Sequence, residues 1–171
     1  MSPAPEPWLR GPRPGIPALL QPAGHAFVLA REDTDTAVAG MEEPLVWLRP
    51  GGVASIGFHL AHLAGSTDRL LTYARGEPLN EAQRVALAGE LRIDEQRPGL
   101  AELLGRWHGT VERALAQLAA TDEASLLEPR FVGRARLPSN VLGLLIHAAE
   151  HAARHTGQVV TTAKLLRAGR V

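Results

Sequence analysis

The sequence predicts an all-α protein, a four-helix bundle that follows a proline-rich N-terminal arm. Apolar residues recur at spacings of three and four over four long segments, which is the pattern of amphipathic helices. Turns that contain proline or glycine separate several of these segments. With 171 residues, of which 45% are hydrophobic and 21% charged, the chain has the composition of one globular domain. We expect an arm over residues 1–17 and a single helical domain over residues 18–171.

The arm is predicted from its composition. Residues 1–17 hold six prolines and almost no apolar periodicity, which favours an extended segment held partly by Trp8 and Leu9. The chain then becomes helical in composition, and we expect a first helix over residues 18–41.

The second long helix has a clearer pattern, from Val53 to Arg75. Arg75 in its last turn and Gly76 just beyond predict its end, because arginine complements the carbonyl end and glycine tolerates a left-handed cap. Its apolar stripe consists of Ile56, Leu60, Leu63, Thr67, Leu71 and Ala74.

A short helix and a third long one follow. Asn80 and Gln83 have the spacing of a capping box, which predicts a short helix that ends near Glu90. Leucines, Trp107 and Val111 form a stripe that predicts a helix over residues 98–120.

The periodicity lapses between residues 121 and 138, where a short hairpin around Gly133 is expected. The last helix is predicted over residues 139–167, with Ser139 as its N-cap and Gly169 just after its end.

Charge and cysteine content exclude several classes of protein. Lys and Arg number 18 and Asp and Glu also 18, so the basic excess of a general nucleic-acid binder is missing. No segment approaches the roughly 18 uninterrupted apolar residues of a membrane span. The absence of cysteine rules out disulfides, thiolate metal sites and a cysteine nucleophile. Since the first 16 residues do not form a signal peptide, we expect a cytoplasmic protein without nucleic-acid or membrane partners.

Five of the seven histidines lie in two clusters. His147, His151 and His155 recur every four residues on the last helix, so their rings share one side of it. His151 and His155 fall within or beside the apolar stripe, whereas His147 is rotated away. On the second helix, periodicity alone favours His59 over His62 as the inward residue. Such histidines can hold a divalent ion, but the same spacing also occurs in surface histidines and in core histidines that need no metal.

Two segments resemble motifs of the DinB superfamily. The segment from Ser55 to Ser66, which contains His-Leu-Ala-Gly-Ser, is similar to the second-helix motif of that family. The segment from His151 to Gln158 is similar to its terminal-helix motif, in which His-x-x-x-His runs into Gly-Gln. The resemblance extends over roughly residues 19–166.

The resemblance implies a four-helix bundle, usually dimeric, with a divalent metal held by three histidines. Its motifs match His62 on the second helix and His151 and His155 on the last, so the resemblance and the periodicity disagree about His59 and His62. Thr156 stands where the family usually has arginine, so a substrate role at that position is not carried over.

Three imidazole ligands leave open positions on a zinc or nickel ion, as in catalytic sites. The resemblance implies a homodimeric enzyme that transfers a low-molecular-weight thiol to a small electrophilic substrate, or a related hydrolase or isomerase. The alternative is a non-catalytic, metal- or ligand-binding dimer in a stress response. The two differ in whether the metal keeps an exchangeable ligand that faces a pocket.

Other polar residues have simpler interpretations. Glu150 points away from His151 and is expected at the solvated surface or between subunits. Asp68 and Arg69 are expected as an exposed or interfacial pair. Tyr73 is expected to pack in the core or an interface, and His108 to be structural.

Overall fold

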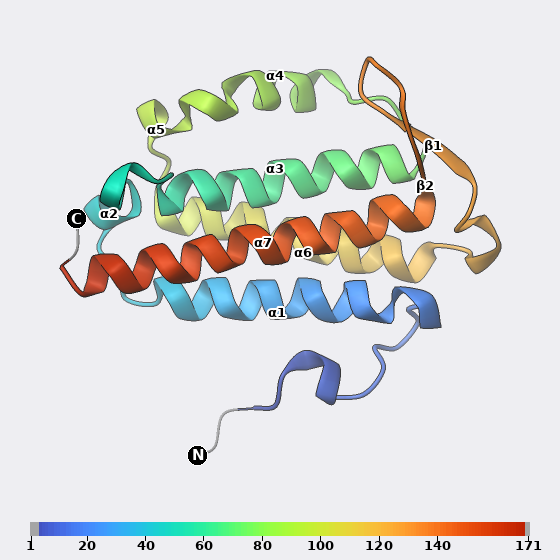
Figure 1. Ribbon diagram of the computed structural model, residues 1–171, viewed down its shortest axis with the longest axis horizontal. Helices are drawn as coiled ribbons and strands as arrows, with labels where there is room; N and C mark the ends of the chain where they lie inside the picture. The colour runs from blue at the N-terminus through green and yellow to red at the C-terminus, as the bar shows by residue number, and fades with distance from the viewer. Residues whose placement is uncertain (1–3, 170–171) are drawn as a thin grey trace.

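The computed structural model describes residues 4–169, and its main feature is a set of long helices that lie side by side (Figure 1). The chain is mostly helical, in agreement with the predicted α-helical class. Within the described residues, the helices are too short or too polar to span a bilayer. The four long helices are α1 (Gln21–Val38), α3 (Ile56–Ala74), α6 (Leu100–Ala120) and α7 (Val141–Arg167).

Shorter elements precede the first long helix or connect the long helices. They are α2 (Glu43–Val46), α4 (Glu81–Gly89), α5 (Ile93–Gln96), the strands β1 (Pro129–Val132) and β2 (Leu137–Asn140), and the 3-10 turns η1 (Pro7–Leu9), η2 (Ala18–Leu20), η3 (Pro50–Gly52), η4 (Glu90–Arg92) and η5 (Glu123–Ser125). The two strands pair antiparallel and form the predicted hairpin. The first predicted helix is shorter than expected, because α1 ends at Val38 and Gly40 takes a positive φ of 67° in the turn that follows.

The sequence predicted the N-caps of α4 and α7, and the structure agrees for the first of them only. The capping box of Asn80 and Gln83 is present at the start of α4. At α7, however, the cap is Asn140, whose side chain accepts a hydrogen bond from the backbone N–H of Gly143 at 2.7 Å. Ser139 is not the cap, because it is still paired in the hairpin and the extended backbone continues for one more residue.

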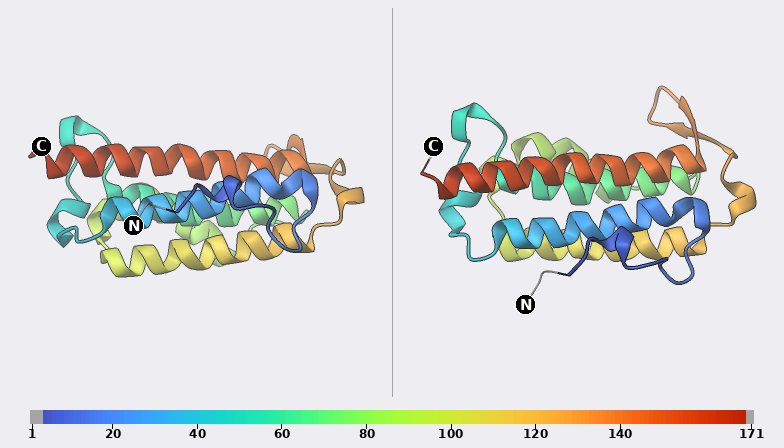
Figure 2. Two further views of the ribbon diagram at one scale, coloured as in Figure 1. Left: turned by 90° about the horizontal axis from the view of Figure 1, so that it is seen from below. Right: turned by 60° about the horizontal axis from the view of Figure 1, so that its bottom comes forward.

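The core lies where the long helices face one another. Both α6 and α7 pack along α1 and α3, so each long helix has two long neighbours (Figure 2). The largest fully buried side chains include Trp107, Phe27, Leu60, Leu63 and Leu145. The contact between α3 and α7 is the one that positions the candidate site.

The described part of the arm is more structured than predicted. It contains η1, which packs beside α1 (Figure 2). Arg10 forms an ion pair with Glu32 on α1, and Ile16 is buried in the core, whereas Trp8 and Leu9 are exposed. The expectation that Trp8 and Leu9 hold the arm is therefore wrong. Residues 1–3 and 170–171 lie outside the described residues, and the boundary at residues 17 and 18 stays a prediction.

Candidate metal centre

Three histidines meet at the contact between α3 and α7. One ring nitrogen from each of His62, His151 and His155 lies within 4.8 Å of the other two. The Nε2 atoms of His62 and His151 are 2.8 Å apart, and the ring of His155 lies 4.4 Å from that of His62, centre to centre. All three side chains are partly buried.

The helical repeat explains how the three rings come together. His151 and His155 are one turn apart on α7, and their ring centres are 4.5 Å apart. The packing of α7 along α3 then brings His62 opposite both. His147, one turn earlier on α7, is exposed and interacts with Glu150, as its rotation away from the stripe predicts.

His59 occupies a different position from His62. It is only 6% exposed, which agrees with the periodicity that made it the inward residue of its helix. Its Nδ1 lies 3.0 Å from Nδ1 of His155, so it contacts the cluster from the core side. The trio of mutually close nitrogen atoms contains His62, in agreement with the resemblance. Which of the two binds a metal stays a prediction.

A carboxylate that the sequence analysis did not single out contacts the cluster. Glu90, the first residue of η4, accepts a hydrogen bond from Nδ1 of His62 through Oε1. Its Oε2 accepts a second hydrogen bond, of 2.8 Å, from Nη1 of Arg69. Asp68 and Arg69 were expected as an exposed or interfacial pair. The exposed alternative is wrong for Arg69, whose side chain is only 12% exposed and pairs with Glu90, and the interfacial alternative stays a prediction. Asp68 instead pairs with Arg113.

Burial controls the protonation of the histidines. Desolvation, followed by repulsion from neighbouring imidazoles, lowers the pKa of His155 to about 4. Desolvation also lowers the pKa of His151 and of His59. At neutral pH these three rings are therefore uncharged, which is the form that binds a metal ion.

Glu90 keeps its charge although it is largely buried. Desolvation raises the pKa of Glu90, but the hydrogen bonds from His62 and Arg69 outweigh it, so its pKa lies below the usual value. A charged carboxylate therefore lies directly behind one imidazole of the cluster.

The donor set fits a divalent ion. One ring nitrogen from each of the three histidines lies within 4.8 Å of the other two, which is close enough for the three to share one ion. Imidazole is a common ligand of zinc and nickel, and three protein ligands leave a position for an exchangeable one.

The remaining candidates lie outside the cluster. Glu150 is exposed and hydrogen-bonds Arg154, which agrees with the expected surface position. Thr156 is 4% exposed and its hydroxyl finds no hydrogen-bond partner among residues 4–169, so this position faces the core. His108 pairs with Asp35. Tyr73 is partly buried against the core, as expected.

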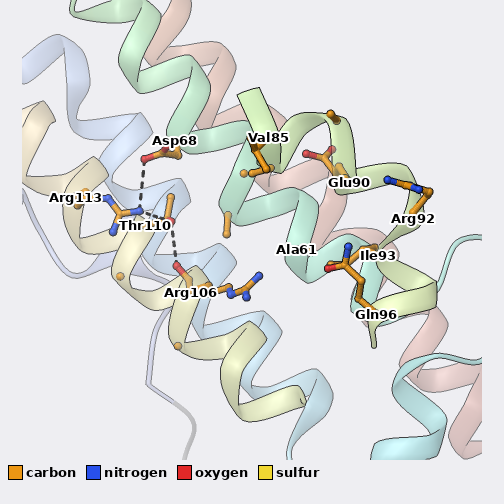
Figure 3. A pocket seen from close by; sticks show the side chains of 17 residues that line it. Ala61, Asp68, Val85, Glu90, Arg92, Ile93, Gln96, Arg106, Thr110 and Arg113 are labelled. Atoms are coloured by element: carbon orange, nitrogen blue, oxygen red, sulfur yellow. Dashed lines mark hydrogen bonds and ion pairs between the residues drawn. The ribbon is translucent and has the colours of Figure 1, made fainter. Parts of the chain in front are cut away.

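A cleft of about 710 Å³ lies next to the cluster, between α3, the α4–α5 segment and α6 (Figure 3). Glu90 belongs to its wall, together with Arg92, Arg106 and Arg113. The histidines do not line it. Glu90 therefore connects the cleft to the cluster.

Comparison with known proteins identifies the family of the chain and a structure of similar fold. A family model described as the DinB superfamily matches residues 26–159. A crystal structure of a protein from Streptococcus pneumoniae is similar in fold, with a TM-score of 0.61 and 16% sequence identity. The similarity covers 85% of this chain and 88% of that chain. No curated protein matches the sequence.

The lowered histidine pKa values predict how stability depends on pH. In metal-free protein, the free energy of unfolding should fall as the pH is lowered from about 6.5 toward 4. The unfolded chain takes up protons at its histidines near pH 6.5, whereas folded His155 does so only near pH 4. Denaturant titrations at several pH values in the presence of a chelator measure this slope. His155→Gln should flatten it and His25→Gln should change it less; equal slopes for both variants would contradict the assignment.

Proposed function

This chain belongs to the DinB superfamily, and on that premise we propose that it is a divalent-metal-dependent enzyme with His62, His151 and His155 as the metal ligands. The observation that carries the proposal is the meeting of three imidazole nitrogens within 4.8 Å. Two of these side chains have a lowered pKa, which keeps them neutral and ready to bind.

The proposal includes the architecture of that superfamily. In it, α1, α3, α6 and α7 are the four helices of the bundle, and the proline-rich residues 1–17 form an appendage to the domain of residues 18–171. The contacts of α6 and α7 with both α1 and α3 support this assignment. A homodimer in the cytoplasm, without nucleic-acid or membrane partners, completes the proposal.

Zinc or nickel is the proposed ion, because both accept imidazole nitrogen and tolerate an open coordination position. When bound, such an ion lowers the pKa of a coordinated thiol or water and so supplies a nucleophile at neutral pH. The residues of the chain bind and orient the ion: the three histidines offer ring nitrogens, and Glu90 holds the proton on Nδ1 of His62.

The proposed reaction is transfer of a low-molecular-weight thiol to a small electrophile, or a related hydrolysis or isomerisation. The cleft beside Glu90 supports a small-molecule substrate, because it is large enough for one and polar side chains, among them Arg92 and Glu90, line its wall. The alternative function is a dimer that binds a metal or ligand without catalysis.

Metal binding is the first test. Purified protein should bind about one Zn²⁺ or Ni²⁺ per chain, because the three nitrogens can share one ion. His151→Ala and His155→Ala should each lower the affinity at least tenfold in a competition titration with a chromogenic chelator. His147→Ala is the matched control, since its ring lies outside the trio. Unchanged affinity in both of the first two variants would refute the site.

The choice between His62 and His59 has a separate test. His62→Ala removes a nitrogen of the trio and should cause loss of metal during dialysis against a weak chelator. His59→Ala should keep its metal, because His59 contacts the cluster only from the core side, through His155. If the second variant loses metal and the first does not, the site has to be rebuilt around His59.

Activity separates the enzyme from the binding protein. Metal-loaded protein should conjugate low-molecular-weight thiols to electrophiles in a screen that follows thiol consumption, and His151→Ala should reduce the rate at least a hundredfold. Tight metal binding without turnover of any thiol, ester or isomerisable substrate would favour the alternative.

A further inference from the structure

The two nitrogens of the His62 ring face different partners. Nδ1 faces the carboxylate of Glu90, and Nε2 faces Nε2 of His151 at 2.8 Å. An ionised carboxylate can only accept a hydrogen bond, so Nδ1 has to carry the proton. A neutral imidazole has one N–H, and Nε2 is therefore left with a free lone pair directed at the other histidines.

We infer that Glu90 is a positioning residue of this site: it holds His62 in the tautomer that offers Nε2 to a metal ion, and Arg69 holds Glu90 in turn. The inference rests on the proposed function and assigns roles to two residues that lie outside the ligand set. Glu90 acts through the imidazole of His62.

Hydrogen bonds and burial restrict the position of Glu90. Its side chain is 11% exposed and that of Arg69 is 12% exposed, so water competes little for their hydrogen bond. Helix α4, which directly precedes Glu90, is also hydrogen-bonded to α3. Gln83 on α4 donates to Oδ2 of Asp68 at 2.6 Å and to Oγ1 of Thr72 at 2.7 Å.

Gly65 leaves room for the ion pair. A Cβ atom at this position would lie 2.9 Å from Nη1 of Arg69 and 3.2 Å from Oε2 of Glu90. Any larger residue at position 65 would displace the guanidinium group of Arg69. The glycine therefore leaves the space in which Arg69 and Glu90 pair beside His62.

Phe58 restricts the other side of the His62 ring. The two rings are stacked, with centres 5.7 Å apart and planes 8° from parallel. One hydrogen bond at Nδ1 and one stacked face together limit rotation of the imidazole, so Nε2 keeps its direction before any ion arrives.

The first experiment compares the wild type with Glu90→Ala and Glu90→Gln. Partners that orient a metal-binding histidine typically contribute about 10- to 100-fold in affinity. Glu90→Ala should weaken Zn²⁺ binding by that factor. Glu90→Gln should lie between, because its amide oxygen can still accept from Nδ1 but carries no charge. Glu150→Gln is the matched control, since Glu150 hydrogen-bonds His147, which lies outside the trio.

The second readout is the tautomer itself. In metal-free protein, ¹⁵N chemical shifts of the His62 ring should show the proton on Nδ1 in the wild type. They should show a shift toward Nε2–H in Glu90→Ala. A purely structural role of Glu90 would leave the tautomer unchanged.

A glycine substitution can disturb the ion pair while the carboxylate of Glu90 stays present. Gly65→Ala should displace Arg69 and weaken Zn²⁺ binding several-fold. Gly105→Ala is its control, because a Cβ there would meet no atom within 4 Å and metal binding should not change. If Glu90→Ala does not fold, Glu90→Gln and the glycine pair carry the test.

The outcomes separate the two proposals. A wild type that binds no Zn²⁺ refutes the metal site, yet the ring shifts still decide whether Glu90 sets the tautomer. If the wild type binds Zn²⁺ and the Glu90 variants bind equally tightly with unchanged ring shifts, the positioning role is overturned and the metal site stands.

Discussion

The packing of α7 along α3 is the contact on which the site depends. Ala148 and Ala152 on α7 and Leu63 on α3 are buried, and the packing of α7 along α3 brings His62 close to His151 and His155. The three histidines are only partly buried at this contact. The lowered pKa of His155 reflects how unfavourable it would be to charge a ring there. The burial of apolar side chains between the helices therefore stabilises the helix positions that hold the imidazoles close together.

Local patterns predicted the helices well, because an apolar stripe reports which side of a helix is buried. Because an apolar stripe reports only burial, the periodicity and the motif resemblance favoured different histidines, His59 and His62, on the second helix. Periodicity identified His59 as inward, and it is the more buried of the two. Membership of the trio depends instead on where α7 lies relative to α3, and the pattern of one helix contains no information about its neighbour. The motif resemblance included that information and pointed to His62.

Features that depend on contacts between distant segments were missed. Glu90 follows a short helix and reaches His62 only because the α4 segment folds back over α3 (Figure 1). Arg69 was expected beside Asp68, yet its partner lies 21 residues further along the chain. Ser139 was expected as a cap, but pairing in the hairpin extends to Asn140. In each case a tertiary contact decided between local options that the sequence left nearly equal.

The charges around the cluster bear on which function is correct. The carboxylate of Glu90 is balanced by the guanidinium of Arg69, so the pair adds no net charge beside His62. Three neutral imidazoles would likewise leave the charge of a divalent ion uncompensated. An ion held in this way favours an anion at its remaining position, because the partly buried surroundings screen charge poorly. A thiolate or hydroxide meets that requirement, whereas a purely structural zinc site normally closes with a fourth protein ligand. A metal-bound thiolate in the proposed enzyme and an anionic ligand in the alternative binding protein both satisfy this charge balance, so turnover has to distinguish them.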